Sequence, residues 1–448
     1  MKDSIMAFPK DFIWGAATAS YQIEGAALQD GRGECIWTRF SHTPGKVANG
    51  DTGDVACDHY HRYPEDVALM RDLGVGAYRF SISWPRVIPA GTGALNPAGL
   101  DFYDRLVDSV CAAGITPWAT LYHWDLPQAL QDRGGWTNPE IVGWFAEYTD
   151  VITRRLGDRV KNWFTHNEPF CTAFLGHMMG VHAPGLTDTR ATFLAVHHAL
   201  IAHGEAVPVI RRNVPGAKAG IVLNPSPQLP ATDHPEDVRL ARRGDAMTNR
   251  LFLDAVFKGQ YPTDLIEIAG QAVDGIDLGA IQKAAVKCDF LGINYYMRWI
   301  LAHVPGKPEE AVNRFPPGTE FTAMDWEIYP QGLTDMLTRI HREYGPIDIY
   351  VTENGAAFDD PEPNNGVVED PRRVAYLRGY LAAAQAAIAQ GVPLKGYFVW
   401  SLLDNFEWAY GYEKRFGIIH VDFQTQKRTP KQSALFYKRL IAGQETLG

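Results

Sequence analysis

Cysteine is scarce in this chain, with five among 448 residues. The five are Cys35, Cys57, Cys111, Cys171 and Cys288. Their number is odd and none belongs to a Cys-x-x-Cys pair, so we expect free thiols. Cys171 follows a glutamate by three residues. No thiol-activating partner lies near it in the sequence, which favours a structural role over that of a nucleophile.

The chain also lacks a long apolar run and an excess of basic charge. No stretch of about 18 apolar residues occurs, and the segment from Met1 to Pro9 has no apolar core of signal-peptide length. The 42 basic and 52 acidic residues give a net charge of −10, which disfavours binding to nucleic acid or to an anionic membrane. We therefore expect a cytoplasmic protein without a nucleic-acid or membrane partner, and a homo-oligomer remains open.

Histidines occur in groups that could suggest a metal site. His59 lies close to His61, and a second group comprises His197, His198 and His203. The second group belongs to the apolar stretch from residue 193 to residue 210, whose pattern favours one packed helix. We predict neither a metal nor a cofactor.

Strand-like and helix-like segments alternate along the whole chain, which is typical of βα units around a parallel sheet. Eight segments have the composition of buried strands: 12–20, 77–83, 116–123, 162–168, 219–224, 290–296, 349–354 and 396–402. With 46% hydrophobic residues, the chain can bury one large core. We predict an α/β fold over residues 1–448, a single (β/α)8 TIM barrel whose core runs from about residue 8 to residue 443.

Amphipathic stretches separate the predicted strands. One helical stripe consists of Leu100, Tyr103, Leu106, Val107 and Val110. Glycines follow such stretches and are expected to end helices; they are Gly74, Gly114, Gly157 and Gly345.

Two glutamates stand at the ends of buried strands. Glu168 follows the run from Val160 to Thr165, and Glu353 follows the run from Ile347 to Thr352. A single such glutamate would be interpreted as the cap of the next turn. Two of them in one chain favour acid/base or nucleophilic chemistry.

A TIM barrel forms its active site at the carboxyl ends of the strands and in the loops that follow them. Polar and aromatic residues gather there in this sequence: Gln22, Arg79, His123, Asn167, Glu168, Asn294, Tyr296, Glu353 and Trp400. Long loops rich in Gly, Pro and Trp follow several strands, and we expect them to form the walls of a pocket. They are residues 24–58, 170–188, 299–329 and 404–420.

Paired carboxylates, aromatic rings and amides at one barrel mouth are typical of a sugar site, and glycoside hydrolysis is the reaction that fits. One carboxylic acid must protonate the departing oxygen while the other carboxylate attacks the anomeric carbon. Arg79 is expected to pair with Glu353 and keep it charged. That charge would raise the pKa of Glu168.

Seven sequence blocks carry a specific resemblance. They are residues 8–25, 78–86 (Tyr-Arg-Phe-Ser-Ile-Ser-Trp-Pro-Arg), 122–127 (Tyr-His-Trp-Asp-Leu-Pro), 167–169 (Asn-Glu-Pro), 292–296 (Gly-Ile-Asn-Tyr-Tyr), 352–355 (Thr-Glu-Asn-Gly) and 400–408 (Trp-Ser-Leu-Leu-Asp-Asn-Phe-Glu-Trp). With these blocks in this order, the sequence from about Phe8 to Tyr437 resembles family 1 glycoside hydrolases of the bacterial β-glucosidase type.

The resemblance implies roles for individual residues. It makes Glu168 the acid/base and Glu353 the nucleophile of a retaining reaction, with roughly 5 to 5.5 Å between their carboxyl groups. It implies that Asn294 and Tyr296 orient the nucleophile. Hydroxyls of the sugar would be bound by Gln22, His123, Asn167, Glu407 and Trp408, with Trp400 as the stacking platform and Trp326 at the aglycone. The implied substrate is a small β-glucoside or a cello-oligosaccharide.

Two positions depart from the family pattern. His166 stands where relatives carry an apolar residue, and strand alternation points it away from the side that Asn167 faces. His177 replaces a tyrosine. We interpret His166 as a structural variation.

Alternative functions exist on the same scaffold. A 6-phosphoglycosidase would read a sugar phosphate through a Ser, a Lys and a Tyr, where this chain has Glu407, Lys414 and Phe416. The carboxylate of Glu407 would repel the phosphate. A catalytically silent carbohydrate-binding protein is disfavoured because both glutamates are present. Gluco, galacto or fuco preference, the aglycone, transglycosylation and the oligomeric state stay open.

Overall fold

The computed structural model describes residues 8–447. Met1 to Ala7 and Gly448, which belong to the predicted domain, lie outside the described residues, and so does most of the segment expected to lack a signal peptide. Eight parallel strands close into a barrel in the order β1-β11-β10-β7-β5-β4-β3-β2. They are β1 (Ile13–Ala17), β2 (Ala77–Ser81), β3 (Thr116–Tyr122), β4 (Asn162–Asn167), β5 (Lys218–Leu223), β7 (Phe290–Asn294), β10 (Asp348–Asn354) and β11 (Leu394–Trp400). All eight predicted strands and the TIM-barrel fold are confirmed.

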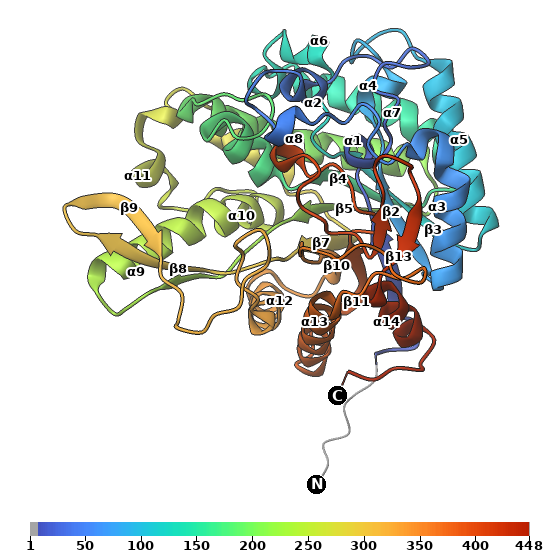
Figure 1. Cartoon of the computed structure of the whole chain (residues 1–448). Coiled ribbons are helices and arrows are strands. Elements are labelled where there is room, and N and C mark those ends of the chain that lie inside the picture. Colours follow the sequence, from blue (N-terminus) through green and yellow to red (C-terminus); the bar gives the residue numbers. More distant parts are fainter. Residues whose placement is uncertain (1–7, 448) are drawn as a thin grey trace.

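Helices cover the outside of the barrel between successive strands (Figure 1). The α-helices are α1 (Ser20–Ile23), α2 (Ile36–Ser41), α3 (His59–Leu73), α4 (Trp84–Val87), α5 (Pro97–Ala112), α6 (Gln128–Gln131), α7 (Ile141–Leu156), α8 (Thr189–Asn213), α9 (Pro235–Asp245), α10 (Leu251–Lys258), α11 (Leu265–Ala269), α12 (Pro330–Tyr344), α13 (Pro371–Ala389) and α14 (Gln432–Ile441). Short 3-10 helices are η1 (Ala48–Gly50), η2 (Gly135–Thr137), η5 (Gly270–Val273), η6 (Leu278–Ala284) and η7 (Trp408–Tyr410), and π-helices are η3 (Cys171–Met178) and η4 (Ala246–Arg250).

The apolar stripe, the helix-ending glycine Gly74 and the second group of histidines lie on or at the end of helices, as the sequence predicts. The apolar stripe that begins at Leu100 is buried on α5. Gly74 ends α3 in the left-handed conformation with a φ of +78°, which a residue without a Cβ adopts freely. The histidines of the second group are buried on α8. This helix is long and apolar enough to cross a membrane, but 83% of its most apolar window is buried inside the fold, so α8 is a core helix.

Several strands end earlier than the sequence predicts. β1 stops at Ala17, and Ser20 already belongs to α1, where its backbone N–H donates to Ser81 Oγ at 2.7 Å. β7 stops at Asn294 instead of Tyr296. One further backbone hydrogen bond follows each strand end, from Thr18 N–H to the Arg79 carbonyl at 2.9 Å and from Tyr295 N–H to the Glu353 carbonyl at 3.0 Å.

Aromatic rings fill the barrel interior. Trp118 on β3 lies with ring centroids 4.8 to 5.7 Å from four rings on other strands: Phe164, Phe290, Tyr350 and Phe398. Gly15 on β1 allows this packing, because a Cβ there would lie 2.3 Å from the Phe398 ring. The interior is therefore a packed core and not a pore.

The two strands that carry the glutamates are irregular close to their carboxyl ends. The register between β4 and β5 shifts between Phe164 and Asn167, and the register between β10 and β7 shifts between Val351 and Glu353. Such irregularities re-aim side chains and are frequent beside active sites. In both strands, the shift directly precedes the residues that face the mouth.

The long loops contain secondary structure that the sequence does not reveal. Part of residues 299–329 forms β8 (Trp299–Val304) and β9 (Lys307–Asn313), which extend β6 (Gln228–Pro230) into a three-stranded sheet. A second small sheet joins β12 (Ile419–Val421) to β13 (Arg428–Pro430). These strands pair with one another outside the barrel, and four of the five are short or largely polar; β8 has the apolar run 299–302 but lies within a segment expected to be a loop.

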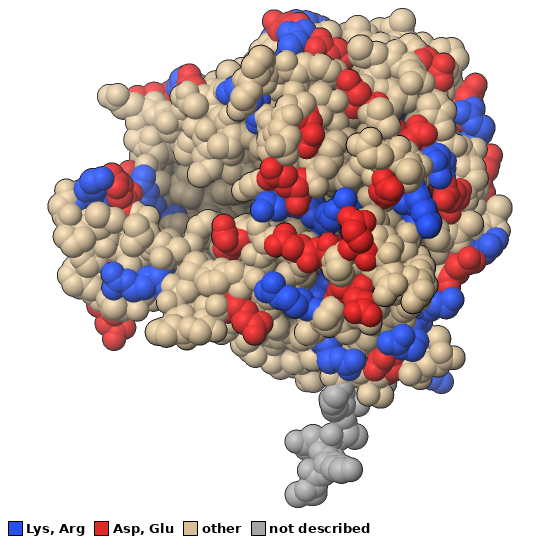
Figure 2. All heavy atoms as spheres, viewed as in Figure 1, with Lys and Arg blue, Asp and Glu red and all other residues tan. Residues whose placement is uncertain are grey.

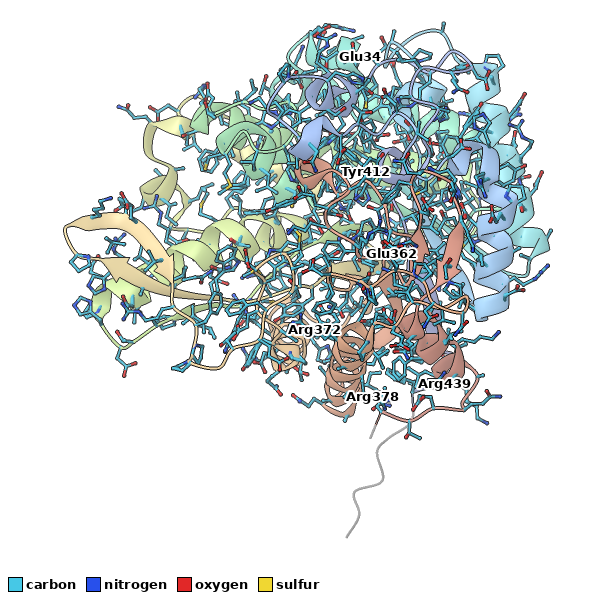
Figure 3. The ribbon with its side chains drawn as sticks, in the orientation of Figure 1. Glu34, Glu362, Arg372, Arg378, Tyr412 and Arg439 are labelled. Carbon is cyan, nitrogen blue, oxygen red and sulfur yellow. The ribbon has the colours of Figure 1, made fainter. Side chains whose placement is uncertain are left out.

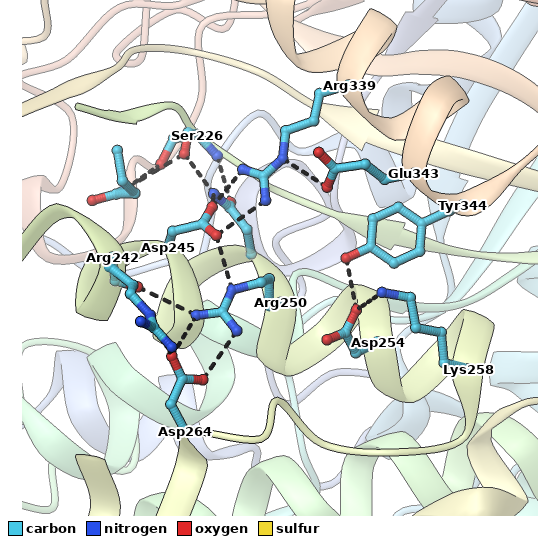
Figure 4. Close-up of polar contacts among 12 residues, drawn as sticks. Ser226, Arg242, Asp245, Arg250, Asp254, Lys258, Asp264, Arg339, Glu343 and Tyr344 are labelled. Carbon is cyan, nitrogen blue, oxygen red and sulfur yellow. Dashed lines mark hydrogen bonds and ion pairs between the residues drawn. The ribbon is translucent and has the colours of Figure 1, made fainter. Parts of the chain in front are cut away.

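An ion-pair network fastens the segment between β5 and β7 to α12 (Figure 4). Asp245, the last residue of α9, accepts hydrogen bonds from Arg250 on η4 and from Arg339 on α12. Asp264 pairs with Arg250 and with Arg242. The network thereby connects α9 and η4 to α12.

Charges of both signs are mixed over the face of the molecule shown in Figure 2, and a hollow opens between the lobe that carries α11 and the β8–β9 hairpin. At the lower edge of the view, Arg378 on α13 and Arg439 on α14 lie beside the carboxyl-terminal segment (Figure 3). Both arginines pair with Glu445, which holds this segment against the two helices.

Candidate active site

Glu168 directly follows β4 and is 5% exposed. The sequence predicts it as the last residue of the strand, but the strand ends at Asn167 because the backbone turns at Glu168 with a φ of +47°. Its N–H donates to the carbonyl of Val222 on β5 at 3.0 Å. A left-handed φ at a residue other than glycine costs about 1–3 kcal/mol and is concentrated at functional sites.

Glu353 lies near the end of β10, is 3% exposed and receives two strong donors. Arg79 on β2 donates to its Oε1 at 2.6 Å, and the Tyr296 hydroxyl donates to its Oε2 at 2.6 Å. The following Gly355 is required by packing, since a Cβ there would lie 1.6 Å from the carbonyl oxygen of Trp400. The Glu-Asn-Gly motif therefore fits β10 closely against the end of β11.

A continuous chain of hydrogen bonds joins the two glutamates. Arg79 also donates to Asn167 Oδ1 at 2.6 Å, and Asn294 donates to the same oxygen at 3.0 Å. The Asn294 amide then donates to Glu168 Oε1 at 2.5 Å. Four barrel strands thus bring together residues that lie far apart in the sequence.

The surroundings of the two carboxyl groups are unequal. Burial, followed by the negative charge of Glu353, raises the pKa of Glu168 to about 7. Burial also raises the pKa of Glu353, but the guanidinium of Arg79 and the hydroxyl of Tyr296 both oppose this shift. A full positive charge in contact favours the ionised form of Glu353, whereas Glu168 holds its proton to higher pH.

Gln22 and Glu407 meet on one side of the mouth. Gln22 lies on α1, and its Nε2 donates to Asn405 Oδ1 at 3.0 Å and to Glu407 Oε2 at 3.3 Å. Burial raises the pKa of Glu407 to about 8, with Glu353 as the next cause. Gln22 Oε1 is buried without a hydrogen-bond partner among the described residues. A buried polar atom of this kind fits a ligand hydroxyl.

His123 and the tryptophans form an aromatic layer beside this pair. The His123 ring stacks on Trp400 and Trp408 with centroid distances of 5.9 and 6.1 Å. Asn167 Nδ2 lies 3.1 Å from His123 Nε2, while His123 Nδ1 is buried and unpartnered within the described chain. Burial holds the pKa of His123 well below its usual value, so the ring is neutral and its free nitrogen can exchange a hydrogen bond with a ligand.

Trp326 lies beside Tyr296, the residue that donates to Glu353. Its ring centroid is 5.1 Å from that of Tyr296 and 6.0 Å from that of Phe416. The side chain is half-buried, which leaves part of the ring available for stacking at the rim. All twelve predicted site residues therefore belong to one connected cluster at the carboxyl ends of the barrel strands.

Comparison with known proteins agrees with this geometry. A sequence model of glycosyl hydrolase family 1 matches residues 4–446. Beta-glucosidase A of Thermotoga maritima is 51% identical over 441 residues, which cover 98% of each chain. Beta-glucosidase A of Acetivibrio thermocellus is 49% identical over 98% of this chain and 99% of its own. The chain belongs to glycosyl hydrolase family 1. The resemblance seen in the sequence is confirmed.

A solved structure extends the agreement to the fold. The family 1 β-glucosidase from Thermotoga maritima superposes on this family 1 hydrolase with a TM-score of 0.95 at 50% identity, over 98% of this chain and 99% of the other. The fold over 98% of this chain is thus that of a family 1 glycosyl hydrolase.

Cys171 is a residue of this family 1 site whose position the sequence does not reveal. Its Sγ donates to Glu168 Oε2 at 2.9 Å, and Asn224, which follows β5, donates to Cys171 Sγ at 3.5 Å. A signal was available, because residues three apart in a helical segment face each other, and the chain is helical from Pro169 onward.

The two departures from the family pattern lie in the core. His166 is 1% exposed, and its ring stacks on Phe145 at 4.6 Å, away from the mouth as predicted. His177 is fully buried on η3, where its Nδ1 lies 2.9 Å from the carbonyl oxygen of Thr172. Burial lowers the pKa of both imidazoles, which favours neutral core residues.

One described group of side chains has metal-ligand chemistry: the ligand atoms of His234, Asp237 and His303 lie within 4.8 Å of one another. The Asp237 carboxylate is engaged by the backbone N–H and Nδ1 of His303, at 2.8 and 2.6 Å. His234 Nδ1 accepts from the N–H of Glu236 at 3.3 Å, which leaves a proton on Nε2. These residues therefore form a hydrogen-bonded cap at the start of α9.

Proposed function

We propose that this family 1 enzyme is a retaining β-glucosidase, which removes terminal non-reducing β-D-glucosyl residues from aryl or alkyl glucosides and oligosaccharides. The unequal surroundings of Glu168 and Glu353 carry the proposal. Only Glu353 contacts a guanidinium, so the pair offers one acid and one nucleophile.

In the first step, a Glu353 oxygen attacks the anomeric carbon, and the bond from that carbon to the aglycone oxygen breaks as Glu168 gives its proton to the leaving oxygen. A covalent glycosyl-enzyme remains, and Glu168 is now a carboxylate. In the second step, Glu168 takes a proton from water, the water oxygen bonds to the anomeric carbon, and Glu353 is released. Two inversions give net retention, and we expect a carboxyl separation of roughly 5 to 5.5 Å.

The remaining cluster residues would hold the sugar. Gln22, His123, Asn167, Glu407 and Trp408 would bind its hydroxyls, Trp400 would form the stacking platform, and Trp326 would contact the aglycone. The unpartnered buried atoms Gln22 Oε1 and His123 Nδ1 support this assignment, because hydroxyls would satisfy them. The sequence resemblance assigns both Asn294 and Tyr296 to the nucleophile. Tyr296 donates to Glu353, but Asn294 donates to Glu168 Oε1, so Tyr296 would orient the nucleophile and Asn294 the acid/base.

The names of relatives support a small β-glycoside as the substrate. The Thermotoga maritima enzyme has been solved with glucoimidazole and with deoxynojirimycin. A relative from Bifidobacterium breve, 43% identical, is named a bifunctional beta-D-glucosidase/beta-D-fucosidase. A fucoside therefore belongs in the substrate panel beside the glucoside.

A sugar 6-phosphate is a poor fit to this site. Glu407 is a buried carboxyl, and Lys414 donates to the carbonyl of Ala323 at 2.8 Å. Phe416 is buried against Trp326 and offers no hydroxyl. Faster hydrolysis of a nitrophenyl glucoside 6-phosphate than of the unphosphorylated glucoside would refute this exclusion.

The decisive test compares Glu353→Ala with Glu168→Ala on aryl β-glucosides. For Glu353→Ala, we expect near-complete loss of activity, which azide restores while giving a product of inverted configuration. For Glu168→Ala, we expect a loss that is milder on activated leaving groups, because these need no proton. Undiminished hydrolysis by Glu353→Ala would overturn the mechanism.

We further propose one catalytic domain with a core over about residues 8–443, acting in the cytoplasm on β-glucosides such as those released from cellulose. A homo-oligomer is compatible with this function. Fractionation of the source cells would test the cytoplasmic location, and light scattering of the purified enzyme would test the oligomeric state.

A further inference from the structure

Cys171 occupies an unusual position for a thiol. It is the first residue of η3, it is 7% exposed, and its Sγ lies 2.9 Å from Glu168 Oε2. Asn224, which directly follows β5, donates to the same sulfur at a distance of 3.5 Å. Two elements of the barrel therefore fix the thiol against the carboxyl group.

The two oxygens of Glu168 have different donors. Oε1 receives the amide of Asn294, whose own Oδ1 accepts from the Thr352 hydroxyl at 2.8 Å. Oε2 receives the thiol of Cys171. With one donor on each oxygen, the plane of the carboxyl group is set from both sides.

The thiol itself stays protonated. Burial raises the pKa of Cys171 well above its usual value, and the charge of Glu168 raises it further. The sulfur is thus a hydrogen-bond donor and not a thiolate nucleophile. This agrees with the sequence-based preference for a structural residue, but it adds a specific partner.

We propose that Cys171 is a positioning residue for the acid/base: its thiol orients Glu168 and stabilises the carboxylate that forms once the leaving group has taken the proton. The inference rests on the proposed function of Glu168. A donor to a carboxyl oxygen favours the ionised form, and it strengthens when the proton leaves. Without the thiol, Glu168 should hold its proton to higher pH.

Other titratable groups also act on Glu168. They are Glu353 on β10, Arg79 on β2, Tyr296 after β7 and Glu407 in the loop after β11. A substitution at Cys171 changes none of these groups. A shift in the alkaline limb of the pH profile of kcat/KM therefore reports the loss of the thiol.

The test measures kcat/KM against pH for an aryl β-glucoside with a poor leaving group. Cys171→Ala and Cys171→Val both remove the donor but differ in volume. We expect both to move the alkaline limb upward by roughly 0.5 to 1 pH unit, as fits a weak donor. Cys171→Ser keeps a donor and should restore the wild-type limb. Cys111→Ala, at an exposed cysteine, is the matched control and should change nothing.

Two outcomes would overturn the inference. One is an unshifted alkaline limb in both apolar variants, with any loss of rate equal at every pH. The other is a shift in Cys171→Val but not in Cys171→Ala, which would indicate packing. If Glu168→Ala keeps full activity on the same substrate, the proposed function fails instead. If Glu168→Ala is impaired and the Cys171 profiles are unshifted, only the role of Cys171 fails.

Discussion

Tyr296 and Arg79 both donate to the carboxyl group of Glu353, but they act on it in different ways. Arg79 supplies charge, whereas the Tyr296 hydroxyl donates to the other oxygen at 2.6 Å. A hydrogen bond to a charged group contributes about 1.5–3 kcal/mol, and one pKa unit corresponds to about 1.4 kcal/mol. Loss of the hydroxyl should therefore raise the pKa of Glu353.

This predicts the behaviour of Tyr296→Phe. The nucleophile must be ionised, so a higher pKa moves the acidic limb of kcat/KM to higher pH. The alkaline limb, which reports the acid, should move less. Tyr295→Phe, at the preceding buried tyrosine whose hydroxyl lies near the Tyr329 carbonyl, is the matched control. An acidic limb at the wild-type position in Tyr296→Phe would contradict the role of the hydroxyl.

At the scale of elements, a buried lysine holds the loop after β11. Lys431, at the start of α14, is fully buried between Asp360 and Asp404, with Nζ to oxygen distances of 2.5 and 2.7 Å. Asp404 lies three residues before Glu407. Arg415 also pairs with Asp404, and Arg373 with Asp360, so each aspartate would keep one cation without the lysine. Breaking a buried ion pair costs at most about 3–5 kcal/mol.

Lys431→Met should therefore lower the free energy of unfolding by up to about 3 kcal/mol, and it should also raise KM, because the loop that carries Glu407 loses an anchor. Denaturant unfolding and steady-state kinetics measure the two effects. Lys438→Met changes an exposed lysine on the same helix and should leave both within error. Equal stability of the two variants would show that the Asp404 anchor is dispensable.

At the scale of the whole molecule, three buried carboxyl groups oppose the usual effect of pH on stability. Burial raises the pKa of Asp125 to about 7, that of Glu168 to about 7 and that of Glu407 to about 8. The folded protein keeps these protons in a pH range where the unfolded chain has already lost them. Stability should therefore fall as pH rises from about 4.5 toward 8.

We expect a lower Tm at about pH 8 than at about pH 5.5. Each group contributes a slope of at most about 1.4 kcal/mol per pH unit. Glu407→Gln should flatten the dependence, since an amide does not titrate, whereas Glu147→Gln on the exposed side of α7 should not. A Tm that rises steadily from pH 5.5 to 8 would contradict these pKa shifts.

The sequence predicts the features that repeat or that burial dictates. The eight barrel strands are continuous apolar runs, and Glu168 and Glu353 are polar residues at the ends of such runs. What escapes prediction depends on contacts between distant segments. The β8–β9 hairpin pairs outside the core, and Asn224 reaches Cys171 across 53 residues of sequence. Lys431 is buried by two aspartates that no local pattern connects to it.

The aromatic rings packed around Trp118 in the barrel interior lie directly beneath Arg79, whose guanidinium is 5.3 Å from the centroid of the Phe164 ring. In the proposed mechanism, chemistry at Glu353 would therefore take place above a packed core that gives no passage through the barrel. The water that completes a turnover has to enter by the route along which the aglycone leaves. Departure of the first product is thus the event that admits the second reactant, and an aglycone that lingers at the rim delays hydrolysis or becomes the acceptor itself.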